Sequence, residues 1–281
     1  EILALSLYAS FIAGKMLDPT QSAQWRLRIW ILFSAVFFAQ LLIGLFGADD
    51  FLMTGTLHIP VPAMIVAGPL FRAARFFMPI LFVSTLFLVG PAWCSQLCYI
   101  GAWDAAASIH KKKPLVMPKW RQHIRIAILL SVVVVSLLLR WTGASAFVSV
   151  GFGLFFGISG IGIMIFWSRK SGVMTHCITY CPIGLLANWL GRLSPFRIRI
   201  DRQCNSCGAC RLVCRYDALT EKNIQNKTPG KTCTLCGDCI KTCKDRWIEY
   251  RFFRLSPQNA RKLFITLIVC LHAVFLGVAR I

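Results

Sequence analysis

The chain of 281 residues is 57% hydrophobic and carries a formal net charge of +20. A mean hydropathy of +0.64 excludes an ordinary soluble domain, so the apolar runs must be compared with the thickness of a bilayer. The basic residues flank apolar segments instead of forming one long run, which argues against nucleic acid as a partner. Composition therefore predicts a polytopic membrane protein.

Apolar segments alternate with basic loops along the chain. The first, 2–14, is too short to span a bilayer alone, and we expect it to be the processed or truncated end of a membrane helix. The segment 57–70 is interrupted by three prolines and is expected to be interfacial or re-entrant. Length and hydropathy predict five spans, at residues 29–47 (followed by Asp49 and Asp50), 76–89, 124–141, 146–167 and 263–278.

Basic residues mark one set of span ends. A loop with Lys111, Lys112, Lys113 and Arg125 joins two of the predicted spans, and Arg169 follows another. Loops rich in lysine and arginine lie in the cytoplasm in most membrane proteins. We therefore predict that these ends, together with the segment 201–250 before the last span, face the cytoplasm.

Eight cysteines between residues 204 and 243 repeat the spacing C-x2-C-x2-C-x3-C twice. In bacterial ferredoxins with this spacing, the fourth cysteine of each run binds the cluster of the other run. The sequence therefore predicts two [4Fe-4S] clusters, one on Cys204, Cys207, Cys210 and Cys243, the other on Cys233, Cys236, Cys239 and Cys214.

Zinc is the alternative for these cysteines, because C-x2-C pairs also bind that metal, but two identical four-cysteine runs favour paired clusters. Gly208 and Gly237 follow the second cysteine of each run and supply the backbone freedom that a tight wrap requires. Arg215 and Lys244 follow the fourth, where positive charge is expected to raise the reduction potential.

Two further pairs with C-x3-C spacing, Cys94/Cys98 and Cys177/Cys181, follow the two returning spans, each with a glycine three positions later. This correspondence predicts two parallel repeats that bring the four thiols together at the cytoplasmic edge of the bilayer. Three roles are open to them: a third metal site with iron–sulfur, copper(I) or zinc, redox disulfides, or packing as small apolar side chains. His176, next to the second pair, is a metal ligand, a proton acceptor for quinol or a structural residue.

The two C-x3-C pairs followed by the double ferredoxin run resemble the NapH/MauN/NosR group of membrane polyferredoxins, over about residues 27–279. The pattern of that group is C-x3-C-P twice; here Pro182 follows the second pair and Tyr99 the first. The resemblance implies a multi-pass protein of the bacterial inner membrane with clusters that face the cytoplasm. It also implies an electron-transfer subunit of an oxidoreductase complex, with quinol dehydrogenase activity as one form, and it extends to the copper-reducing protein CcoG.

The fold class expected is an all-α polytopic membrane protein of five or six transmembrane helices, with an internal two-fold repeat and a small 2[4Fe-4S] ferredoxin-like domain. We expect a membrane domain over 1–200, the ferredoxin-like domain over 201–250 and a final helix in 251–281.

The expected function is passage of electrons between a cytoplasmic donor or the quinone pool and a respiratory or periplasmic partner. The alternatives are a copper reductase or assembly factor that uses the C-x3-C thiols, and a scaffold whose clusters are structural. Expected partners are membrane lipid, other subunits of a redox complex, and an acidic ferredoxin or flavodoxin drawn to the basic surface of the domain. Anionic lipid headgroups explain the same charges.

Overall fold

Helices dominate the computed structural model, which describes residues 2–48 and 59–278. The longer helices are α1 (Ile2–Leu17), α2 (Ser22–Leu45), α4 (Phe77–Val89), α6 (Arg121–Trp141), α7 (Ala146–Ile163) and α12 (Pro257–Val278). Between them lie the shorter helices α3 (Met64–Arg72), α5 (Tyr99–Ser108), α8 (Arg169–Ser171), α9 (Pro182–Leu190), α10 (Glu221–Gln225) and α11 (Asp238–Thr242). The predicted all-α class is confirmed, with one small sheet added to it.

Five helical segments are long and apolar enough to cross a membrane, namely Ser22–Leu45, Phe77–Leu97, Arg121–Trp141, Ala146–Ser171 and Pro257–Gly277. Each overlaps one of the five predicted spans and so confirms it, with ends that differ from the predicted ones by up to eight residues. The predicted segment 2–14 is the shorter apolar helix α1, which packs along α12. Within the predicted segment 57–70, the chain forms the start of α3, which packs against α6. Residues 57 and 58, like Asp49 and Asp50, lie outside the described residues.

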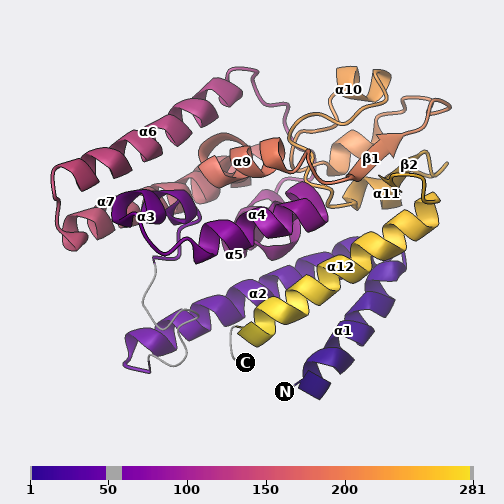
Figure 1. Cartoon of the computed structure of the whole chain (residues 1–281). Helices are drawn as coiled ribbons and strands as arrows, with labels where there is room; N and C mark the ends of the chain where they lie inside the picture. The colour runs from indigo at the N-terminus through magenta and orange to yellow at the C-terminus, as the bar shows by residue number, and fades with distance from the viewer. Residues whose placement is uncertain (1, 49–58, 279–281) are drawn as a thin grey trace.

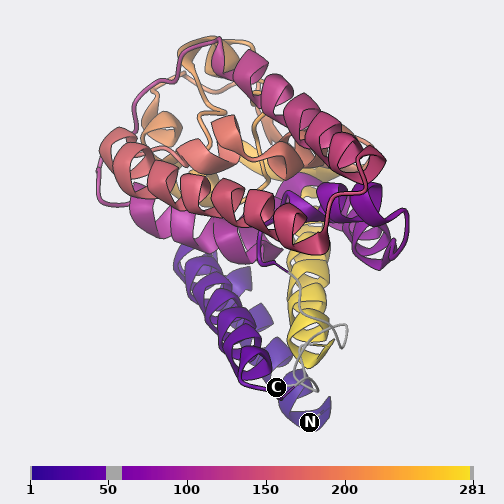
Figure 2. The ribbon, with the colours of Figure 1, turned by 90° about the vertical axis from the view of Figure 1, so that its left-hand side faces the viewer.

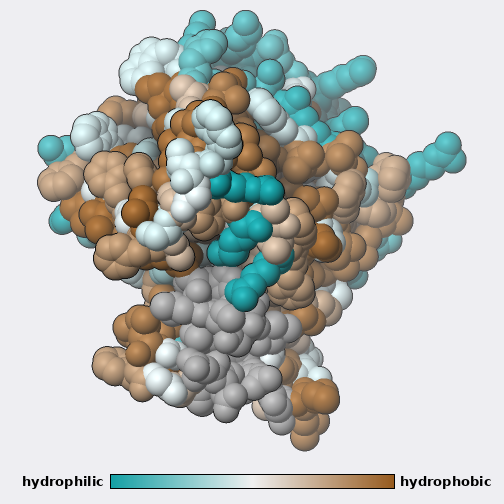
Figure 3. Space-filling view, turned by 60° about the vertical axis from the view of Figure 1, so that its left-hand side comes forward, coloured by the Kyte–Doolittle hydropathy of each residue, from teal (hydrophilic) through white to brown (hydrophobic). Residues whose placement is uncertain are grey.

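The helices pack in successive layers (Figures 1 and 2). Helices α1, α2 and α12 form one layer, α4, α5 and α9 lie next to it, and α6 and α7 form the opposite side. Hydrophobic side chains cover most of the face shown in Figure 3, and hydrophilic ones gather along its upper margin. This distribution suits a bundle whose sides contact lipid.

A buried histidine on α12 contacts both other helices of the first layer, α1 and α2. The Nε2 atom of His272 lies 3.0 Å from the carbonyl oxygen of Ile29, and its Nδ1 atom lies 3.3 Å from the hydroxyl of Tyr8. Both nitrogens therefore have partners on neighbouring helices, so the polar ring costs little in an apolar layer. The sequence analysis gave this residue no role, because a single histidine in an apolar span does not reveal its contacts.

Two antiparallel strands flank the predicted ferredoxin-like domain, residues 201–250, which we call the ferredoxin segment. Strand β1 (Phe196–Ile200) pairs with β2 (Ile248–Phe252), in a register that places Phe196 opposite Phe252. Alternate residues of both strands are buried, and the ring of Phe196 packs edge-on against Phe264 of α12. The predicted domain 201–250 thus starts and ends at a sheet that rests on the last membrane helix.

Ion pairs join the ferredoxin segment to the membrane helices. Arg26 of α2 pairs with Asp238 at 2.7 Å, and Arg121 at the start of α6 pairs with Asp217 at 2.6 Å. Most of the side-chain surface of all four residues is buried. Because each half of the segment has its own pair, the segment is held at two separate points.

Arg215, which follows the fourth cysteine of the first run, is a third attachment point. Its guanidinium donates to the carbonyl oxygens of Lys111 (2.7 Å) and Gly172 (2.8 Å), and its own carbonyl accepts from the N–H of Met174 (2.9 Å). These partners lie in the loop before α6 and the turn after α8. Arg215 therefore anchors the chain directly after Cys214 to the membrane domain.

Replacing Arg215 by alanine should loosen this attachment. Loss of two hydrogen bonds from a charged donor should cost about 1.5 kcal/mol, which raises the population of the detached segment roughly tenfold. Limited proteolysis should accordingly cut between residues 201 and 250 roughly tenfold faster. The exposed Arg202→Ala is the control, and equal cleavage rates in both variants would contradict the role of Arg215.

Candidate metal centres

The two ferredoxin runs adopt the same backbone conformation. Gly208 and Gly237 have φ angles of +77° and +81°, and Ser206 and Leu235 one turn earlier have +58° and +57°. These left-handed conformations turn the chain just before and just after the second cysteine of each run. The predicted need for glycine is confirmed at both positions.

The fourth cysteines are also equivalent. The N–H of Ala218 donates to the Sγ of Cys214 at 3.3 Å, and the N–H of Trp247 donates to the Sγ of Cys243 at 3.2 Å. Each donor lies four residues after its cysteine. Backbone N–H groups that point at sulfur stabilise the thiolate form, which is the form that binds iron.

The four cysteines of the second predicted group lie together. Cys214 of the first run lines one small cavity together with Cys233, Cys236 and Cys239 of the second run. In the first run, burial raises the pKa of Cys210 to about 11, and the neighbouring Cys204, Cys207 and Cys214 thiols raise it further. Thiol donors around a shared cavity fit an iron–sulfur cluster at the second group, whereas the first group, with Cys243 as its fourth ligand, stays a prediction.

Each C-x3-C pair lies on its own single turn of π-helix. The turns are Trp93–Leu97 and His176–Tyr180. Each closes on its second cysteine: the N–H of Cys98 donates to the carbonyl of Trp93 at 3.0 Å, and the N–H of Cys181 donates to that of His176 at 2.8 Å. Such turns are frequent at functional sites. The same rare turn in both halves supports the predicted internal repeat.

Close backbone approach explains the glycine after each pair. A Cβ atom on Gly101 would lie 2.8 Å from the carbonyl oxygen of Cys94, and one on Gly184 would lie 2.7 Å from that of Cys177. Any other residue would therefore push helices α5 and α9 away from the π-turns.

The two halves differ in the side chain that holds each turn. The indole N–H of Trp30, on α2, donates to the carbonyl of Cys98 at 2.7 Å. In the other half, the guanidinium of Arg125, on α6, donates to the carbonyls of Cys177 (3.1 Å) and Cys181 (3.4 Å). The expectation that Arg125 belongs to a basic loop was wrong: it is 4% exposed inside the helix, because its charge serves the thiol turn.

The four C-x3-C thiols form one buried site. Each of the four cysteines is at most 9% exposed, and all thirteen cysteines of the chain are free thiols. Burial raises the pKa of Cys177, and the nearby Asp104, Cys181, Cys98 and Cys94 raise it further. We call this group the four-thiol site.

Two helix N-termini point at the four-thiol site. Burial raises the pKa of Cys98 to about 12, whereas the N–H groups of Gly101 and Ile100 at the start of α5 lower it. Burial likewise raises the pKa of Cys181, and the N–H of Gly184 at the start of α9 lowers it. Helix N-termini carry partial positive charge, so both helices favour an anionic group at this place.

Several buried polar atoms around the four-thiol site have no hydrogen-bond partner among the described residues. They are the Oε1 of Gln96 and the Oγ1 of Thr179, at the centre of each C-x3-C motif, and Oδ1 of Asp104. The other carboxylate oxygen of Asp104 accepts from the N–H of Cys177 at 2.9 Å. Unpartnered buried atoms are rare in native proteins, so their concentration here indicates a polar group that completes the site.

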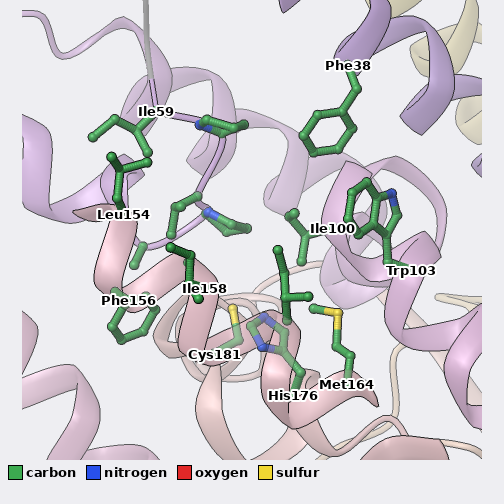
Figure 4. Close-up of a pocket in the computed structure, with 16 residues that line it drawn as sticks. Phe38, Ile59, Ile100, Trp103, Leu154, Phe156, Ile158, Met164, His176 and Cys181 are labelled. Atoms are coloured by element: carbon green, nitrogen blue, oxygen red, sulfur yellow. The ribbon is translucent and has the colours of Figure 1, made fainter. Parts of the chain in front are cut away.

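An apolar cavity of about 130 Å³ adjoins the four-thiol site. Figure 4 shows His176 and Cys181 side by side at its wall, with Phe38 and Trp103 across from them. Neither ring nitrogen of His176 has a hydrogen-bond partner in the described part of the chain, although the ring packs against Gly160. Burial lowers the pKa of His176 to about 4, so its imidazole is neutral at pH 7.

The sequence analysis missed Trp30 and Ser95, and it misplaced Arg125. Trp30 and Arg125 each hold one thiol turn, but they lie far from the cysteines in sequence and on different helices. Ser95 lies inside the first C-x3-C motif, so its position was visible in the sequence. Its hydrogen bond to the carbonyl of Thr234, in the second ferredoxin run, depends on how the two parts of the chain pack.

The glycines of the ferredoxin runs offer a matched pair of variants. A Cβ at Gly237 would lie 2.5 Å from the hydroxyl oxygen of Tyr250, whereas one at Gly208 meets no atom within 4 Å. Both alanine variants carry the same strain of about 1 kcal/mol from their positive φ. We expect Gly237→Ala to lose iron and thermal stability, and Gly208→Ala to retain both better. Equal iron content and melting temperature in the two variants would contradict this account of the second run.

Comparison with known proteins identifies relatives. Residues 71–115 and 146–201 match the family described as "4Fe-4S binding domain". The ferredoxin-type protein NapH of Haemophilus influenzae is 24% identical over 267 residues, which cover 88% of this chain and 86% of that protein. The putative electron transport protein YccM of Escherichia coli is 24% identical over 201 residues, or 62% of this chain and 55% of that protein.

A third relative, an uncharacterized protein of Methanocaldococcus jannaschii, is 22% identical over 188 residues, which cover 65% of this chain and 72% of that protein. No solved structure matches the chain. The family match and these relatives confirm the resemblance drawn from the cysteine motifs: the chain is similar to the NapH ferredoxin-type protein, and it combines a match to a 4Fe-4S binding domain with helices long and apolar enough to cross a membrane.

Proposed function

We propose that this protein transfers electrons across the interface between its ferredoxin segment and its membrane helices. Two [4Fe-4S] clusters occupy the cysteine groups of the two runs, and the four-thiol site holds a third iron–sulfur centre. Iron–sulfur centres supply one-electron redox chemistry, and the protein positions them and sets their potentials. The proposal agrees with the name of the relative YccM as a putative electron transport protein.

One contact carries the proposal. The hydroxyl of Ser95, between Cys94 and Cys98, donates at 2.9 Å to the carbonyl of Thr234, which lies between Cys233 and Cys236. Ser95 is fully buried. The first C-x3-C motif and the second ferredoxin run are thus joined by a direct hydrogen bond, which provides a short route for electrons between the two sites.

The family match supports iron–sulfur chemistry at the four-thiol site. The matched residues, 71–115 and 146–201, contain both C-x3-C pairs and end before the first ferredoxin cysteine. The description "4Fe-4S binding domain" therefore applies to the helical repeats themselves. The two helix N-termini and the guanidinium of Arg125 would stabilise the negative charge of a cluster with thiolate ligands.

The alternative of copper reduction receives less support. Copper(I) suits thiolate ligands, but the family match that covers both C-x3-C pairs is described as a 4Fe-4S binding domain. A scaffold role with structural clusters would not explain a hydrogen-bonded link between two sulfur sites.

Quinone is the small-molecule partner that the cavity beside His176 fits. The cavity is lined by aromatic and aliphatic side chains, and its polar lining includes the unpartnered imidazole next to Cys181. A neutral imidazole can accept a hydrogen bond from a quinol hydroxyl and so orient the quinol beside the adjacent sulfur centre, which would take its electrons one at a time. Quinone sites share this combination of an apolar wall and a few polar groups.

Charge distribution supports placing the ferredoxin segment in the cytoplasm. The helix ends on that side carry most of the basic residues, including Lys111, Lys112, Lys113 and Arg169. The positive-inside rule assigns such ends to the cytoplasmic face. In this orientation a cytoplasmic donor or acceptor docks at the ferredoxin segment, and the other redox partner is reached through the membrane helices.

Iron and sulfide content tests the three-centre arrangement. Wild-type protein purified without oxygen should contain more than about eight irons per chain, the content of two four-iron clusters. A variant with Cys94, Cys98, Cys177 and Cys181 changed to serine should fall to about eight and keep the ferredoxin spectra. Cys270→Ser, at an exposed thiol of α12, is the control. Equal iron in all three samples, or copper in place of the additional iron, would refute the third centre.

Substitution of His176 tests the quinol site. His176→Leu keeps a buried side chain of similar size and should fold with its full iron content. Reduction of the clusters by a soluble quinol analogue should slow about tenfold, as expected for the loss of one orienting hydrogen bond of about 1.4 kcal/mol. The exposed His123→Leu should behave like wild type. A wild-type rate in His176→Leu would remove this residue from the quinol site.

A further inference from the structure

Tyr216 lies between the two sulfur sites that the proposed function connects. It follows Cys214 by two residues and is 3% exposed. Its side chain belongs to the same packed cluster as Cys177, and Cys214 and Cys236 pack against that cluster from the ferredoxin side. It also lines the cavity shared by the four cysteines of the second group. Its side chain therefore lies in the packed region between the two sites.

The hydroxyl of Tyr216 has no hydrogen-bond partner among the described residues. Buried tyrosine hydroxyls almost always have one, because they lose their water contacts on folding. Tyr250 shows the usual case: it is equally buried beside the second run, and its hydroxyl donates to the carbonyl of Leu235 at 2.7 Å. The Tyr216 hydroxyl therefore needs an acceptor that comes within hydrogen-bond distance when the metal centres are bound.

The surroundings of Tyr216 limit what that partner is. The guanidinium of Arg26 is a donor and is already bound to Asp238 and to the carbonyl of Ser95. The other packed neighbours include Trp30 and Met174, whose side chains offer no good acceptor. Sulfur is the remaining acceptor, because Cys177 belongs to the same packed cluster as Tyr216, and Cys236 both packs against that cluster and lines the cavity that Tyr216 lines.

We propose that the Tyr216 hydroxyl donates a hydrogen bond to a thiolate sulfur at the junction of the four-thiol site and the second ferredoxin group. The bond raises the reduction potential of the centre that accepts it, because a donor to sulfur stabilises the more negative reduced state. This inference rests on the proposed function, in that iron–sulfur centres occupy these cysteines. It assigns Tyr216 as a positioning and tuning residue, distinct from the cluster ligands.

Redox titration followed by electron paramagnetic resonance tests the bond. Tyr216→Phe keeps the ring and removes only the hydroxyl, so one cluster signal should become harder to reduce. At the ambient potential that half-reduces this centre in wild type, the ratio of reduced to oxidised centre should fall about fivefold, as expected for the loss of one net hydrogen bond. Tyr8→Phe is the control and should leave the potentials unchanged, because its hydroxyl contacts His272 between the membrane helices and not a sulfur site.

The titration also identifies the acceptor. If the shifted signal persists in the variant that lacks the four C-x3-C cysteines, the acceptor belongs to the second ferredoxin group. If the shifted signal disappears in that variant, the acceptor belongs to the four-thiol site. Both results support the inference. Unchanged potentials for every signal of Tyr216→Phe, at full iron content, would overturn it.

A second substitution keeps the test decisive if Tyr216→Phe loses iron. Incorporation of 3,5-difluorotyrosine at position 216 retains the shape of the ring and makes the hydroxyl a stronger donor. The potential of the same centre should then rise, in the opposite direction to the phenylalanine variant. No shift with the fluorinated residue would also overturn the inference. A wild-type protein with no reducible cluster signals would refute the proposed function itself, which is a different outcome.

Discussion

The structure depends on the close approach of two short helices to two π-helical turns. Gly101 and Gly184 let the starts of α5 and α9 pack directly against the carbonyls of Cys94 and Cys177. This packing directs backbone N–H groups toward the second cysteine of each pair and buries all four thiols in one place. The spans, the anchoring arginines and the ferredoxin segment surround the starts of these two helices.

The sequence predicted most of the fold because its strongest signals are periodic or exactly spaced. Apolar length identified the five spans, and the repeated cysteine spacing identified both runs and their glycines. The contacts that complete the sites were not predictable in the same way. Trp30 and Arg125 act on cysteines more than 50 residues away, and Arg125 was counted with the loop charges because a cation near the end of a predicted span reads as a flanking residue. Tertiary packing, which no local pattern contains, decides such contacts.

The two repeats are related in backbone but differ in charge. An uncharged indole holds one thiol turn, and a guanidinium holds the other. A buried cation on one side stabilises negative charge more strongly there than on the opposite side. A centre bound between these halves therefore has two unequal faces, although its four ligands come from matching motifs.

The attachment of the ferredoxin segment has a consequence for kinetics. Arg26, Arg121 and Arg215 hold it against the membrane helices at three points, and Ser95 bonds directly to the second run. The two sulfur sites therefore keep a constant separation during turnover, unlike redox carriers that swing between partners on a tether. Solvent viscosity should accordingly slow the arrival of a soluble partner while leaving the internal electron step unchanged.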